Sequence, residues 1–231
     1  MEKFKLTRGE KAWILYDVGN SAFILLVSTI IPIYFNALAA GEGISDSDYL
    51  AAWGYAGSVS TLLVAVSSPL LGTLAGRRNM KPILFVASLI LGALGCACLG
   101  FAWGWVSFLV IFVIAKVGYS SANVFYDAML PEITTESRMD KVSSLGYAFG
   151  YIGSCIPFIL SLVVVLFYER FGISQTTAML IAFLITTVWW VGLTIPLLRT
   201  YRHTAYSETS GTKISETFRR FVRTFKNIRR E

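Results

Sequence analysis

Residues 105–130 read WVSFLVIFVIAKVGYSSANVFYDAML, an apolar stretch long enough to cross a bilayer as one helix. The stretch ends at Pro131, a charged loop with the sequence EITTESRMDK follows, and a second apolar stretch begins with VSSLGYAFGYIGS. Lys116 lies near the middle of the first stretch, about 16 Å along the helix from Trp105. A lysine at that depth costs roughly 2.5–3.5 kcal/mol to insert, so it needs water, a carboxylate or a substrate beside it.

The composition around this stretch is that of a polytopic membrane protein. Of the 231 residues, 55% are hydrophobic and 15% are charged, with a mean hydropathy of +0.62. Soluble domains are about 45–50% apolar and about 25% charged. Six apolar runs are long enough to span, and none has the alternation of a membrane strand. The runs cover residues 13–38, 50–75, 82–101, 104–128, 142–167 and 176–198. We therefore expect an all-α protein with a bundle of six transmembrane helices over residues 1–198.

The basic residues predict the orientation of this bundle. With the N-terminus in the cytoplasm, the cytoplasmic segments hold 18 of the 20 lysines and arginines, which indicates that both termini are inside. The net charge of +6 is thus a membrane-orientation signal and not a nucleic-acid signal. The basic tail, 199–231, contains an amphipathic helix at about 214–230, which either lies on anionic lipid or forms a solvated linker. A bacterial inner membrane is the expected location.

Polar residues in the first and fourth runs predict a cavity between them. Asp17, Asn20 and Ser21 share one helix face by their i, i+3, i+4 spacing. The fourth run carries a polar stripe and a neighbouring tyrosine, namely Lys116, Ser120, Asn123, Asp127 and Tyr126. In lipid such faces turn inward. Lys116 and Asp17 would either share a substrate there or form a purely structural ion pair.

Small residues mark helix contacts. Gly146, Gly150 and Gly153 form a flat stripe on the fifth run. Such a stripe either packs within the bundle or offers a smooth face to a second bundle. In the first run, Pro32 allows a kink.

Several kinds of chemistry have no support in the sequence. No nucleotide loop, catalytic serine motif or zinc-binding helix motif is present, so we expect neither an enzyme nor a metal site. Cys96, Cys98 and Cys155 lie inside apolar runs, as small buried residues do. No cofactor is expected, and transport would be driven by a gradient, with coupling to protons or another ion left open.

Three segments resemble the vacuole-effluxer-like branch of the major facilitator superfamily, which includes the autophagy-related vacuolar permeases. They are WILYDVGNSAF (13–23), NVFYDAMLPEI (123–133) and VSSLGYAFGYIGS (142–154). The loop GTLAGRRNMKP (72–82) is similar to the superfamily's gating signature, which Gly72, Arg77 and Lys81 match. Gly76 stands where that signature has an aspartate, a departure that bears on gating.

The resemblance implies a fold of twelve helices in two halves, with substrate at their interface. This chain would then be the N-terminal half of a secondary transporter for a small polar solute, such as an amino acid, working by alternating access. Completion would require a second copy or a complementary six-helix half. The alternatives are a non-transporting scaffold or regulatory half, a truncated fragment, and a small dimeric channel.

Overall fold

The computed structural model describes residues 4–206, and in this part six helical spans are long and apolar enough to cross a membrane. The helices are α1 (Arg8–Ser28), α2 (Ile30–Gly41), α3 (Asp46–Ala75), α4 (Met80–Cys98), α5 (Trp105–Asp127), α6 (Leu130–Ile133), α7 (Glu136–Leu166) and α8 (Gln175–Thr200). A 3₁₀ turn, Leu99–Phe101, follows α4. The residues described contain no strand. The amphipathic helix expected at 214–230 lies outside the described residues.

The first span is interrupted between α1 and α2. The break is at Thr29, three residues before Pro32, where the backbone turns to φ −134° and ψ −77°. Pro32 has no N–H to donate to the carbonyl of Ser28, and its ring clashes with that carbonyl, so the break falls one turn earlier than the proline. The hydroxyl of Thr29 donates to the Leu25 carbonyl oxygen at 2.6 Å and thereby satisfies one of the freed acceptors.

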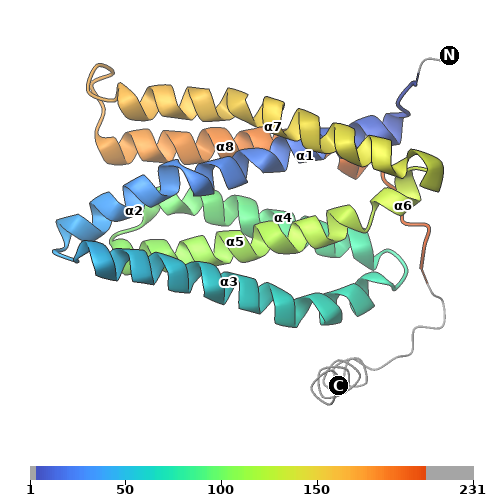
Figure 1. Ribbon diagram of the computed structural model, residues 1–231, viewed down its shortest axis with the longest axis horizontal. Helices are drawn as coiled ribbons and strands as arrows, with labels where there is room; N and C mark the ends of the chain where they lie inside the picture. The colour runs from blue at the N-terminus through green and yellow to red at the C-terminus, as the bar shows by residue number, and fades with distance from the viewer. Residues whose placement is uncertain (1–3, 207–231) are drawn as a thin grey trace.

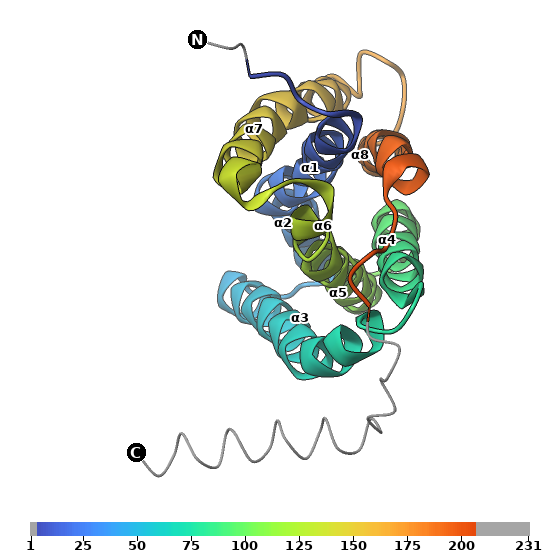
Figure 2. The same cartoon turned by 90° about the vertical axis from the view of Figure 1, so that its right-hand side faces the viewer.

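Two groups of three helices make up the bundle. α1 packs between α7 and α8, α5 packs between α3 and α4, and the contact of α4 with α8 joins the two groups. The end-on view in Figure 2 shows α3 and α7 at opposite edges, with α1 and α5 between them. One end of the bundle, on the right in Figure 1, holds the first residues of α1 and α7 and the last residues of α5 and α8. We call this the N-terminal end.

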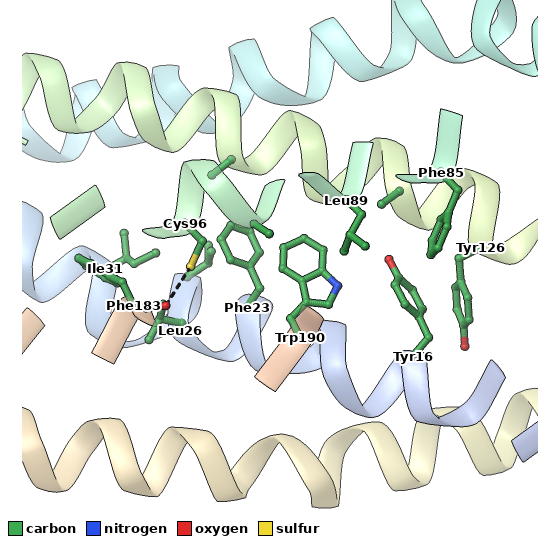
Figure 3. Close-up of a cluster of buried hydrophobic side chains, with 14 of the residues drawn as sticks. Tyr16, Phe23, Leu26, Ile31, Phe85, Leu89, Cys96, Tyr126, Phe183 and Trp190 are labelled. Carbon is green, nitrogen blue, oxygen red and sulfur yellow. Dashed lines mark hydrogen bonds between the residues drawn. The ribbon is translucent and has the colours of Figure 1, made fainter. Parts of the chain in front are cut away.

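A buried apolar layer joins the two groups. Its aromatic side chains come from α1, α2, α4, α5 and α8, and Figure 3 shows Phe23 and Trp190 side by side in it. The Cys96 thiol lies in the same layer and donates to the Phe183 carbonyl oxygen at 3.7 Å. Buried aromatic side chains of this size dominate the stability of such a core.

Glycines set the closest helix contacts. Gly92 and Gly95 of α4 lie against α5, and a Cβ added at Gly95 would come 2.8 Å from the Cα of Ala115. A Cβ at Gly118 of α5 would meet the backbone of Gly92. Backbones can approach this closely in a membrane only where side chains are absent.

The predicted glycine stripe on α7 faces α1. A Cβ added at Gly146 would lie 2.6 Å from Trp13, and one at Gly153 would meet Val18. The stripe therefore packs within the bundle and is not a free face. The open small-residue face belongs to α3, where a Cβ at Gly54 or Gly57 would meet nothing within 4 Å.

Candidate functional site

A polar cavity of about 300 Å³ lies between α1, α5 and α7, towards the N-terminal end. Its wall combines two carboxylates with amides, hydroxyls and tyrosine rings. The lining residues are Asp17, Asn20, Ser21, Ile24, Leu25 and Ser28 of α1, Tyr119, Asn123, Tyr126 and Asp127 of α5, and Tyr147, Tyr151 and Ser154 of α7. A polar wall of this kind inside a membrane bundle is the usual mark of a solute or ion pathway.

Asn123 is the centre of the hydrogen bonds that join α1 to α5. Its side-chain oxygen accepts from the Tyr16 hydroxyl at 3.2 Å and from the Asn20 amide at 3.1 Å. Tyr16 is fully buried and Asn20 is 3% exposed, so both donors would be costly to leave unpaired. These bonds fix the register of the two helices along one side of the cavity.

Tyr126 is held in place by aromatic contacts on both faces. Its ring stacks on Trp13 at 4.3 Å between centroids and lies 4.4 Å from the ring of Tyr16. The Trp13 indole N–H also donates to the Tyr126 carbonyl oxygen at 3.2 Å. Figure 3 shows the Tyr126 hydroxyl directed from α5 towards α1. That hydroxyl is buried and has no hydrogen-bond partner among residues 4–206.

The glycines of α7 make room for the cavity's polar side chains. A Cβ added at Gly150 would lie 2.9 Å from the Ser21 hydroxyl oxygen and 3.4 Å from the Asp17 carboxyl carbon. One added at Gly146 would lie 3.2 Å from a carboxylate oxygen of Asp17. The same stripe that lets α7 approach α1 therefore lets Asp17 and Ser21 reach the cavity.

Asp17 and Asp127 have no charged partner. Within residues 4–206 neither carboxylate forms a salt bridge, and the lining contains no lysine, arginine or histidine. The neutral side chain of Asn20 lies beside the Asp17 carboxyl. Asp17 is half-buried and Asp127 is exposed at the edge of the cavity. The cavity is thus a negatively charged site.

Two other carboxylates near this end of the bundle, those of Glu10 and Glu132, are fully paired. Glu10 accepts from two nitrogens of Arg138 at 2.7 Å each, from the Thr134 hydroxyl at 2.6 Å and from the Thr7 backbone N–H at 2.8 Å. Because Thr7 also caps α1 through the Glu10 backbone N–H, this cluster ties the start of α1 to the start of α7.

Glu132 has a similar role after α5. It pairs with Lys81 and accepts from the backbone N–H groups of Thr204 at 2.7 Å and Ala205 at 3.2 Å. Burial raises the pKa of Glu132, but the hydrogen bonds from Lys81, Thr204 and Ala205 outweigh it and hold this pKa below its usual range. Glu132 therefore joins the start of α4 to the segment after α8.

Six of the eight predicted cavity residues line this one cavity, and Lys116 and Ser120 do not. The expected Lys116–Asp17 pair is wrong for this structure, in which the described ion pairs are those of Glu10 and Glu132. The reason is helix register. Asn20 lies level with Asn123 in two antiparallel helices, which puts Lys116 roughly 15 Å along the axis from Asp17.

Sequence reasoning missed the tyrosine walls of the cavity. Tyr119 lies between Phe23 and Trp190, and the hydroxyls of Tyr147 and Tyr151 are 3.1 Å apart. The i, i+4 spacing of Tyr147 and Tyr151 beside a glycine stripe could have marked α7 as a wall.

The loop between α3 and α4 holds the predicted gating residues at the N-terminal end. Gly76 ends α3 with φ −68°, and its N–H donates to the Gly72 carbonyl oxygen at 3.2 Å. A Cβ at Gly76 would make an ordinary 3.5 Å contact with the Thr73 carbonyl oxygen, so the backbone would accept an aspartate. Lys81 also donates to the Ala128 carbonyl oxygen at 3.0 Å, whereas the buried Nε of Arg77 has no partner.

Comparison with known proteins places the chain in a family. The model described as "Vacuole effluxer Atg22 like" matches residues 7–231. The uncharacterized MFS-type transporter YxiO of Bacillus subtilis (strain 168) is 36% identical over 230 residues, 97% of this chain and 54% of that protein. An uncharacterized protein of Aquifex aeolicus (strain VF5) is 27% identical over 150 residues, 64% of this chain and 36% of that protein.

The chain thus spans about half, or less, of the length of these curated relatives. The family description names an effluxer, and the Bacillus relative is named as a transporter. The six spans have the architecture of half of a major-facilitator-type fold. The chain is an integral membrane protein that belongs to the vacuole effluxer Atg22-like family.

Proposed function

We propose that this chain forms one half of a secondary transporter that moves a small polar solute by alternating access. The observation that supports it best is the cavity of Asp17, Asn123 and Tyr126 in a bundle whose other interhelical surfaces are mainly apolar. Unpaired ionisable groups inside a membrane bundle are costly, and function is the usual reason for keeping them.

The second half would cover α3 and α7. These helices are the least buried of the six spans, and both lie at the edges of the bundle. Exposed on them are large apolar side chains such as Tyr55 and Ile152, and the open glycines of α3 add a smooth surface. Either a second copy of this chain or a complementary six-helix half would complete the transporter.

An amino acid is the first substrate to consider. Its amine would bind Asp17 or Asp127, one of which would otherwise carry a coupling proton. Lys116, which lies outside the cavity in the described conformation, would bind its carboxylate in another state of the transport cycle. Under this proposal Lys116→Ala abolishes uptake while leaving expression intact. Full uptake by that variant would remove the lysine from the mechanism.

Both termini would be cytoplasmic in a bacterial plasma membrane. Asp48 lies at the end of the bundle opposite Asp140, and both are exposed. In a chain with Cys98 and Cys155 replaced by serine, a membrane-impermeant maleimide should label Asp48→Cys in intact cells and leave Asp140→Cys unlabelled. The reverse pattern would invert the orientation.

Liposome uptake tests transport itself. Vesicles containing this chain alone, and vesicles containing it with a complementary half, should take up a labelled amino-acid mixture with saturation and counterflow. Non-saturable flux without counterflow would favour the channel. Lack of uptake in both preparations, with the protein folded, would favour the scaffold.

A further inference from the structure

The cavity's charge points to the chemical class of its ligand. Asp17 and Asp127 line one cavity of about 300 Å³, and its lining residues include no basic side chain. Glu10 and Glu132, by contrast, each have a cation in contact. Two carboxylates facing one partly desolvated space repel each other and are stabilised by a cation that enters it.

A second observation is independent of the carboxylates. Tyr126 lines the same cavity, is 3% exposed, and its buried hydroxyl has no hydrogen-bond partner. A buried unpaired hydroxyl destabilises the folded protein, so it is rarely kept without a reason. A ligand that donates N–H groups would satisfy this oxygen and the carboxylates together.

The remaining walls suit a cation that carries carbon. The rings of Tyr119, Tyr147 and Tyr151 line the cavity beside the apolar side chains of Ile24 and Leu25. Aromatic faces attract ammonium groups, and the aliphatic side chains accept an alkyl portion. An inorganic cation would leave both features unused.

The position of Lys116 argues against a simple zwitterion. The antiparallel register of α1 and α5 puts Lys116 roughly 15 Å along the axis from Asp17. In an α-amino acid a single carbon atom separates the amine from the carboxylate. One such molecule cannot contact both residues in this conformation, and its carboxylate would instead face two aspartates.

We propose that this cavity binds a protonated organic amine that has no carboxylate beside the amine. The inference rests on the transport function proposed above and narrows its substrate class from small polar solutes to organic amines. Asp17 and Asp127 would bind the ammonium group, and the Tyr126 hydroxyl oxygen would accept a hydrogen bond from one of its N–H groups. The other tyrosine rings would surround the alkyl portion.

Ligand binding to the full chain in lipid nanodiscs tests this class. The probes are n-butylammonium chloride, 1-butanol, leucine and sodium chloride, with ionic strength held constant by the buffer salt. Binding is followed by tryptophan fluorescence, since Trp13 stacks on Tyr126, and by the rise in Tm. The amine should bind saturably, with an affinity at least about tenfold above those of 1-butanol and leucine.

Matched variants locate the site. Asp17→Asn and Asp127→Asn should each weaken amine binding at least about tenfold, because each removes one charge from the ammonium site. Asp140→Asn makes the same chemical change at an exposed carboxylate with no described partner and should leave the affinity unchanged. Tyr126→Phe should weaken binding by a smaller factor, about threefold to tenfold, since it removes one hydrogen bond.

Several results would overturn the proposal. These are equal responses to the amine and 1-butanol, tighter binding of leucine, a response to sodium alone, or no saturable response to the amine at tens of millimolar. An unchanged affinity for the amine in both aspartate variants would also overturn the proposal. Saturable amine binding without uptake in liposomes would contradict the transport function but support the amine site. Uptake of leucine without amine binding would support the transport function and contradict the amine site.

Discussion

Two pairs of carboxylates near one end of the bundle differ in what surrounds them. Glu10 and Glu132 are almost fully buried, and each has a cation and at least two further donors. Asp17 and Asp127 lie in or at the edge of the cavity and have no described cationic partner. The first pair connects chain segments, whereas the second pair is free to bind something else. The extent of burial alone does not distinguish a structural carboxylate from a functional one. The hydrogen bonds and ion pairs that the carboxylate forms do distinguish them.

The largest loss of stability is expected at Glu10. Glu10→Ala removes the acceptor of Arg138, Thr134 and the Thr7 backbone N–H. The loss of charge-assisted bonds should lower the free energy of unfolding by about 3 kcal/mol. Thermal unfolding in detergent measures it, and a variant with unchanged Tm would show that Glu10 is not structural.

A smaller and pH-dependent loss is expected at Glu132. Its pKa is held below the unfolded value, so the stabilisation is complete above the unfolded pKa of about 4.3 and is lost as the pH falls through the folded pKa. Glu132→Gln should cost about 2 kcal/mol at pH 7 and progressively less as the pH falls below about 4.3. Tm profiles of the two proteins should therefore converge in acid, and parallel profiles would contradict this linkage.

Gly150→Ala tests the wall behind Asp17. The added methyl group would press on the Ser21 hydroxyl and the Asp17 carboxyl, with a cost of about 1 kcal/mol and weaker amine binding. Gly57→Ala is the control, because its Cβ would meet nothing within 4 Å and alanine favours a helix by roughly 0.5–1 kcal/mol. Equal effects of the two substitutions on binding would remove Gly150 from the site.

The smallest effect on folding is expected at Asp17. Asp17→Asn deletes a charge that has no described partner, so the free energy of unfolding should change by less than about 0.5 kcal/mol. Chemical unfolding of the purified variant measures this. A loss comparable to that of Glu10→Ala would place Asp17 among the structural carboxylates.

The sequence was sufficient to predict six spans and the inward faces of α1 and α5, because apolar length and 3.6-residue periodicity act within one helix. It could not place Lys116 against Asp17 correctly, since the register between helices depends on contacts such as Asn20 with Asn123. Glu10 and Glu132 were not singled out at all. Near helix ends they resemble solvated charges until the packing of Arg138 and Lys81 is known.

The most direct test measures stability and binding on the same samples of Asp17→Asn and Glu10→Gln. The difference between the two carboxylate pairs predicts opposite outcomes. Asp17→Asn should keep its Tm and lose n-butylammonium binding, whereas Glu10→Gln should lose Tm and, where folded, keep the affinity. If both variants lost stability and binding together, the two pairs would not differ in role and the cavity would not be a separate binding site.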